Sequence, residues 1–113
     1  FDFLKQFHSS NITGYDLQKK IKLDADALDN IVSLEKRMQV DFVKIDVEGG
    51  ALEVLQGAKH MLREGTVVGL RIESEFNEKY KGQHLFSDVD VFLREFGYEL
   101  SGITPCSWKK NKG

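Results

Sequence analysis

The chain has 113 residues, of which 41% are hydrophobic and 30% charged, with a formal net charge of −2. This composition supports one domain with a modest core and gives no overall field that would attract nucleic acid or an anionic membrane. Its single cysteine, Cys106, excludes an intrachain disulfide framework. No run approaches the roughly 20 apolar residues of a membrane span, and the first residues lack a secretory pattern. We therefore expect a soluble, cytoplasmic protein without membrane or nucleic-acid partners.

The first part of the chain predicts one helix. Residues 1–20 mix large apolar side chains with loop-forming residues, and a beginning this apolar suggests a chain cut from something longer. Residues 20–23 fit a short strand. A helix follows, with Asp24 or Asp26 as its cap, and we expect it to pack on a sheet. Its apolar positions share one face: Leu28, Ile31 and Val32.

The middle of the chain predicts a strand followed by a helix. Residues 42–47 alternate between two faces, with Lys44 and Asp46 on the face opposite the valines and isoleucine. A central parallel strand is usually apolar on both faces, so these two side chains need water or a partner, and they could pair with each other. Residues 51–63 recur with helical spacing, and Gly65 ends that helix.

A second strand and a polar loop come next. Residues 67–73 alternate as a strand does, and the strand ends in two acids, Glu73 and Glu75. The polar segment 77–86 is long enough to act as a cover over a site.

The last elements complete an alternating pattern. The run Ser87 to Asp90 predicts a helix cap with acid in the first turn, and Gly97 stops the helix. Residues 98–103 read as a last strand. Strands that alternate with helices predict an α/β class with a mainly parallel sheet and flanking helices, in a single domain over residues 1–113.

The segment after the first predicted strand is the strongest functional feature. Asp46 and Glu48 follow the strand directly, and ligands of open α/β sheets sit at the carboxyl ends of strands. One interpretation makes these carboxylates reactive groups. The other pairs Asp46 with Lys44 and lets Glu48 cap the following helix, where negative charge is favourable by about 0.3–1 kcal/mol. Spacing leaves both open.

The second pair of acids also has two interpretations. Glu73 and Glu75 share one face if the strand continues, so they could bind sugar hydroxyls or, with Asp46, offer oxygen ligands to a cation such as magnesium. Alternatively they form a solvated strand end with Arg71 as counterion. Metal dependence stays open at this point, and we assign no residue as a metal ligand.

The histidines show no zinc-ligand spacing with one another or with the cysteine. His84 lies in the predicted cover loop, where it could act as a general base or be an exposed polar residue. The others are His8 and His60, of which His60 is expected at the surface.

Residues 44–58, which read Lys44-Ile45-Asp46-Val47-Glu48-Gly49-Gly50 and then an amphipathic helix, resemble the signature segment of FkbM-type S-adenosylmethionine-dependent methyltransferases. Four spaced blocks agree with that family in order: 27–32, 73–76, 80–83 and 86–93. The resemblance covers residues 27–103. This chain departs from the family at Ala51, where a second glutamate is usual, which would impair the chain or change its substrate if that carboxylate takes part.

The resemblance implies a partial class I methyltransferase (Rossmann-like) fold, of which this chain is the carboxy-terminal part. The expected cofactor is S-adenosylmethionine, but the glycine-rich cofactor loop is not visible, and Gly49-Gly50 lacks the spaced glycines of such a loop. We therefore assign no cofactor-binding residue and expect the chain alone to bind the cofactor poorly.

The implied reaction is O-methylation of a carbohydrate or a small natural-product hydroxyl. A carboxylate within reach of the acceptor can remove its proton, and Asp46 is our candidate for this base or positioning role, with Glu48 as its partner. The predicted acceptor-binding residues are Lys44, Glu73, Glu75 and His84. The competing hypothesis is a non-catalytic α/β module for folding or self-association. A sheet cut at its middle exposes an edge and an apolar face, so a stable fragment should form a homodimer.

Overall fold

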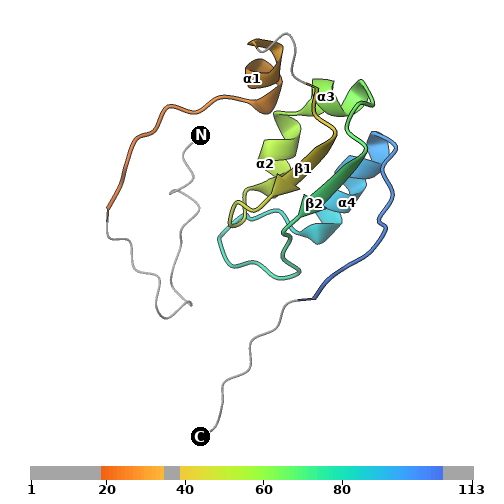
Figure 1. The fold of residues 1–113 in the computed structure, drawn as a ribbon. Coiled ribbons are helices and arrows are strands. Elements are labelled where there is room, and N and C mark those ends of the chain that lie inside the picture. The colour runs from red at the N-terminus through yellow and green to blue at the C-terminus, as the bar shows by residue number, and fades with distance from the viewer. Residues whose placement is uncertain (1–18, 35–38, 106–113) are drawn as a thin grey trace, which may run out of the picture.

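The computed structural model describes residues 19–34 and 39–105. It contains α1 (Leu28–Leu34), β1 (Phe42–Ile45), α2 (Ala51–Gln56), α3 (Lys59–Arg63), β2 (Gly69–Ile72) and α4 (Phe86–Glu95), arranged as Figure 1 shows. Within these residues no helix has both the length and the apolar character needed to cross a membrane. The expectations for His8 and Cys106 fall outside the described residues.

The two strands form a parallel sheet, which confirms the predicted α/β class. Phe42 lies opposite Gly69, and Ile45 lies opposite Ile72. The Glu73 amide also donates a hydrogen bond to the Ile45 carbonyl oxygen, 2.9 Å away. Both strands are nevertheless shorter than predicted, and β1 ends two residues before Val47. The described sheet is a two-stranded unit.

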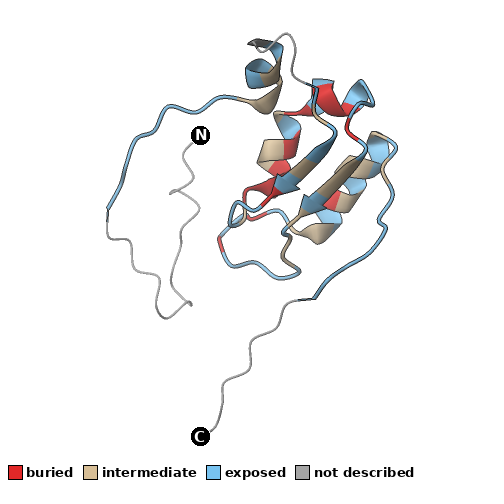
Figure 2. Cartoon of the chain, in the orientation of Figure 1, coloured by how far each residue is buried: buried red, intermediate tan, exposed pale blue. Residues whose placement is uncertain are grey.

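Within residues 19–34 and 39–105, helices cover one face of this sheet and none covers the other. The alternating side chains of the two strands put Val43 and Ile45 toward the helices, whereas Phe42, Lys44 and Arg71 are exposed on the opposite face. Figures 1 and 2 show α2 and α4 behind the strands and the buried positions concentrated between strands and helices. The buried core consists of Ile45, Ala51, Leu52, Leu55, Ala58, Met61, Leu62, Val67 and Val89.

The predicted single helix over residues 51–63 is wrong, because the chain breaks into α2 and α3 at Gly57 and Ala58. The break has a partner in α1. The Asp29 amide donates to the Gly57 carbonyl oxygen at 2.9 Å. The Asp29 carboxylate accepts hydrogen bonds from the amides of His60, at 2.8 Å, and Met61, at 2.9 Å. These bonds satisfy amides that the start of any helix leaves without an intrahelical partner.

The position of α1 also differs from expectation. The Asp26 carboxylate accepts a hydrogen bond from the Ala27 amide at 2.8 Å, but α1 begins at Leu28, so Ala27 rather than the predicted Asp24 or Asp26 occupies the cap position. The principal contact of α1 is with α3 rather than with the sheet. A Cβ atom on Gly57 would lie 3.2 Å from the Ala27 Cβ, so glycine permits the close approach of α1. Residues 20–23 form no strand and are exposed.

The end of the described chain contains one confirmed helix and no strand. The helix α4 has Leu85 as its N-cap, so the predicted cap at Ser87 lies two residues too late. The Asp88 carboxylate accepts a hydrogen bond from the Leu85 amide at 2.8 Å. The predicted strand over residues 98–103 is absent. Instead, the Tyr98 hydroxyl donates to the Val67 carbonyl oxygen at 2.8 Å. A side-chain hydrogen bond, rather than strand pairing, therefore links this segment to the region before β2.

Candidate functional site

A tight turn connects β1 to α2 and carries two of the predicted acids. The Gly50 amide donates to the Val47 carbonyl oxygen at 2.8 Å. Glu48 has a φ of 22° and Gly49 a φ of 88°, both in the left-handed region. The helix α2 begins after Gly50 without a side-chain hydrogen bond at its cap. The interpretation of Glu48 as a helix cap is therefore wrong.

Three carboxylates meet at the carboxyl ends of the two strands. Oxygen atoms of Asp46, Glu48 and Glu73 all lie within 4.8 Å of one another, and all three residues are exposed. The parallel register produces this, because Ile45 and Ile72 are paired and each is followed by an acid. We refer to Asp46, Glu48 and Glu73 as the carboxylate cluster. As cation ligands the sequence had suggested Asp46 with Glu73 and Glu75. In the structure Glu48, which was predicted as the partner of Asp46, lies in this group instead of Glu75.

The surroundings of Glu73 shift the pKa of its carboxyl group. Its pKa is raised above 4.5, chiefly because its protonated form can hydrogen-bond with the carboxylate of Asp46. Desolvation, and repulsion from Asp46, Glu48 and Glu75, raise the pKa further. A carboxyl group with a raised pKa keeps its proton to a higher pH than usual, which is the direction in which enzymes adjust acidic acid–base groups.

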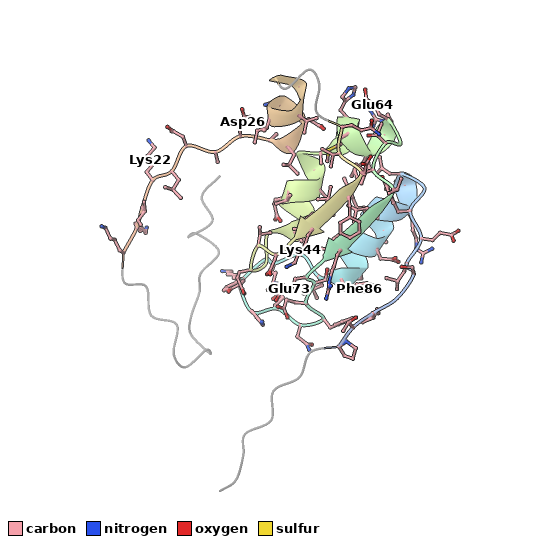
Figure 3. The ribbon with its side chains drawn as sticks, in the orientation of Figure 1. Lys22, Asp26, Lys44, Glu64, Glu73 and Phe86 are labelled. Carbon is pink, nitrogen blue, oxygen red and sulfur yellow. The ribbon has the colours of Figure 1, made fainter. Side chains whose placement is uncertain are left out.

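The basic side chains expected beside the acids interact with them only weakly. Lys44 Nζ lies 4.0 Å from Asp46 Oδ2, and these side chains are 66% and 54% exposed. An exposed pair at this distance contributes little to stability, so it supports the pairing interpretation only weakly. Figure 3 shows Lys44 and Glu73 near the end of the sheet to which the strands run. Within residues 39–105, Arg71 forms no ion pair with Glu73.

Glu75 belongs to the loop rather than to the carboxylate cluster. Its Oε1 lies 2.8 Å from Lys79 Nζ, and this hydrogen bond raises the pKa of Lys79. The Glu75 carbonyl oxygen also accepts a hydrogen bond from the Phe86 amide at 2.8 Å. Glu75 is therefore bonded to residues near both ends of the predicted cover loop, Lys79 and Phe86.

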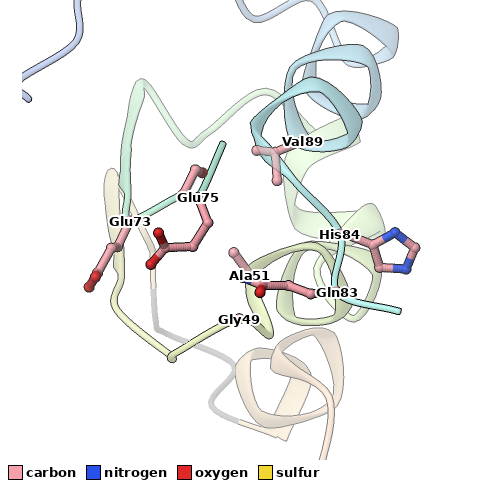
Figure 4. Close-up of a pocket in the computed structure, with 8 residues that line it drawn as sticks. Gly49, Ala51, Glu73, Glu75, Gln83, His84 and Val89 are labelled. Atoms are coloured by element: carbon pink, nitrogen blue, oxygen red, sulfur yellow. The ribbon is translucent and has the colours of Figure 1, made fainter. Parts of the chain in front are cut away.

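A small hollow opens beside the cluster. Its volume is about 10 Å³, which is room for roughly one water molecule. Gly49 and Glu73 border it, as Figure 4 shows. The full lining consists of Gly49, Ala51, Glu73, Ser74, Glu75, Gln83, His84 and Val89. Ligand pockets for drug-sized molecules measure roughly 300–1,000 Å³, so the hollow itself is too small for a nucleoside cofactor.

His84 lies apart from the carboxylate cluster. In Figure 4 its ring lies on the side away from Glu73 and Glu75. Its Nε2 is 3.6 Å from Glu53 Oε1, and its Nδ1 is 3.9 Å from Asp88 Oδ2. The structure thus brings together Asp46, Glu48 and Glu73 from the predicted set, with Lys44 beside them, and separates His84. His60 is at the surface as expected, 2.9 Å from Glu64 Oε1.

Two residues of the loop are buried, and the burial of one of them, Gln83, was not predicted. Gln83 is only 5% exposed, and its Oε1 accepts hydrogen bonds from the amides of Lys79, at 2.8 Å, and Tyr80, at 3.2 Å. Tyr80 is buried as well, against Gly49. A glutamine within a polar loop gives no sequence signal of burial. The nearest available signal was the glycine pair, which permits a close approach by another segment.

The geometry limits what the site can do. Three carboxylates at the carboxyl ends of two neighbouring strands can accept hydrogen bonds from hydroxyl groups, exchange a proton through Glu73, or offer oxygen ligands to a divalent cation. These are the chemical capacities that the described residues provide.

Comparison with known proteins identifies a family. The model of the methyltransferase FkbM domain matches residues 3–100 of this chain. A search of curated proteins and a search of solved structures each returned no match. The matched span includes every residue of the carboxylate cluster and both buried loop residues.

Proposed function

Because this chain belongs to the methyltransferase FkbM domain family, we propose that it acts in methyl transfer from S-adenosylmethionine to a hydroxyl of a carbohydrate or small natural product. The observation that carries this proposal is the carboxylate cluster, whose oxygens lie within 4.8 Å of one another at the ends of two parallel strands. This is the edge of an α/β sheet at which ligands bind. The two-stranded unit is compatible with part of the class I fold.

The acids have separable roles in this proposal. Asp46 accepts the hydrogen bond of the acceptor hydroxyl and orients it, and Glu48 extends the same polar surface. Protonated Glu73 can hydrogen-bond to Asp46, so the raised pKa of Glu73 helps this pair to take up the proton that the hydroxyl releases. Lys44 lies near enough to contribute a further donor to the acceptor.

The turn at Gly49 and the hollow beside it do not fit S-adenosylmethionine. A backbone cradle needs open space above its glycines, but a Cβ atom on Gly49 would lie 2.8 Å from the Tyr80 ring. The hollow next to this glycine has room for roughly one water. We therefore assign no cofactor-binding residue and propose that residues 39–105 supply the acceptor side of the site.

The proposal predicts a slow, Asp46-dependent transfer. The chain is incubated with methyl-labelled S-adenosylmethionine at millimolar concentration and a panel of carbohydrates and hydroxylated natural products. We expect label in at least one acceptor. The Asp46→Asn variant should lower that rate by about 10²–10⁴-fold, as loss of a general base does.

The control variant is Asp24→Asn, which changes an exposed aspartate outside the cluster and should leave the rate unchanged. Equal rates for wild type and Asp46→Asn would contradict the role of the cluster. Calorimetric titration with S-adenosylhomocysteine separates the cofactor from the acceptor. Micromolar binding by this chain, weakened in Asp46→Asn, would contradict our placement of the cofactor outside the described residues.

The second candidate function is a non-catalytic module that associates with a copy of itself, and the open sheet face favours it. Phe42 is 59% exposed on that face and covers Gly69. Ala51 is buried in the core, so the position where the family usually carries a glutamate serves packing here. Exposed sheet edges and apolar faces promote pairing between chains.

Sedimentation equilibrium tests this second function. A self-associating module should be dimeric at micromolar concentration, and Phe42→Glu should make it monomeric because a charge replaces the exposed ring. Val91→Glu is the matched control, since Val91 is 61% exposed on α4. A wild-type chain that remains monomeric at high concentration would exclude the module.

A further inference from the structure

The polar loop after β2 rests directly on the turn that carries the acids. A Cβ atom on Gly49 would lie 2.8 and 3.1 Å from two carbon atoms of the Tyr80 ring. It would lie 3.3 Å from Cδ of Gln83. These distances place both side chains in close contact with the Gly49 backbone, and glycine is required there both for space and for its φ of 88°.

Gln83 fixes the shape of the loop at this contact. Its side-chain oxygen accepts hydrogen bonds from two backbone amides, those of Lys79 and Tyr80. The backbone amide of Gln83 donates in turn to the Tyr80 carbonyl oxygen at 3.1 Å. A buried amide oxygen with two donors holds a loop in one conformation, because breaking these bonds would leave polar groups unsatisfied.

The same loop begins at Glu73. Glu75, two residues later, forms an ion pair with Lys79. Tyr80 and Gln83 follow in the same loop and contact Gly49. Gly49 directly follows Glu48. The loop therefore joins the Glu73 end of the carboxylate cluster to the turn that carries its other two members.

Electrostatic repulsion among these acids favours their separation. Three carboxylates with oxygens within 4.8 Å of one another repel when ionised, and neighbouring like charges separate where the backbone allows it. The turn at Glu48 and Gly49 lies outside the strand ladder, so strand pairing alone does not hold it.

We propose that Tyr80 and Gln83 are positioning residues, which hold the turn over residues 46–49 so that the carboxylates of Asp46 and Glu48 face Glu73. Neither residue needs to touch the acceptor for this role. The inference rests on the proposed function for the use of the cluster in proton transfer, but its geometric content can be measured without any activity.

The pKa of Glu73 is the readout, because it depends on the proximity of Asp46 and Glu48. It is measured by NMR titration of the side-chain carboxyl carbons. In Gln83→Met, which keeps the length of the side chain but removes the acceptor, we expect the Glu73 pKa to fall toward 4.5. Gln83→Glu retains an acceptor oxygen and should keep the pKa raised. Gln56→Met, at an exposed position of α2, should leave it unchanged.

A folded Gln83→Met protein with the wild-type Glu73 pKa would overturn the proposal. If this variant does not unfold cooperatively, Gly49→Ala tests the contact from the other side, since the added methyl group displaces the Tyr80 ring. A folded Gly49→Ala protein with an unchanged Glu73 pKa would likewise overturn it. A lowered Glu73 pKa in these variants supports the positioning role even if no acceptor is ever methylated. The test of positioning is therefore independent of the test of the proposed function.

Discussion

Leu55→Ala is expected to lower the free energy of unfolding by about 2–5 kcal/mol, the range for a large-to-small change in a packed core. Leu55 is 1% exposed and belongs to the buried core. Its truncation removes apolar burial and leaves a cavity. The loss should be visible as a lower midpoint in urea denaturation followed by circular dichroism.

Leu100→Ala provides the comparison, because Leu100 is 49% exposed and its truncation should change the free energy of unfolding little. Equal losses for Leu55→Ala and Leu100→Ala would mean that the core does not lie where the structure places it.

Asp29→Ala is expected to lower the free energy of unfolding by about 1–3 kcal/mol, since hydrogen bonds to a charged acceptor are stronger than neutral ones. The variant loses both carboxylate contacts, to the amides of His60 and Met61, and leaves the start of α3 without a side-chain cap. The effect should be local as well as global. Hydrogen exchange at the His60 and Met61 amides is expected to accelerate before that of the core strands.

Asp29→Asn retains one acceptor oxygen and should lose less stability than Asp29→Ala. Asp24→Ala is the matched control, at an exposed position before α1. If exchange at His60 and Met61 is the same in wild type and Asp29→Ala, then α1 does not cap α3.

Part of the candidate site could be predicted from the sequence alone. Asp46 and Glu73 each follow an alternating apolar run, and parallel strands bring such positions to one edge. The exchange of Glu75 for Glu48 could not be predicted. It depends on the positive φ of Glu48 and on the bond between Glu75 and Lys79, and neither follows from residue type or spacing.

The burial of Gln83 is a similar case. Glutamine is usually exposed, and the polar composition of the loop predicts a solvated cover. Burial is stable here only because two amides of the same loop satisfy the side-chain oxygen and Gly49 leaves room for the contact. The local sequence pattern does not indicate that these amides and Gly49 will contact Gln83.

The sequence by itself determined the α/β class, the order of the main elements, the parallel strands and the acids at their carboxyl ends, because these follow from periodicity among near neighbours. Tertiary structure decided the break between α2 and α3 and the shape of the carboxylate cluster. The break depends on Asp29, which lies about thirty positions before the amides it caps. Contacts over such separations are set by how the elements pack, and short-range patterns do not encode them.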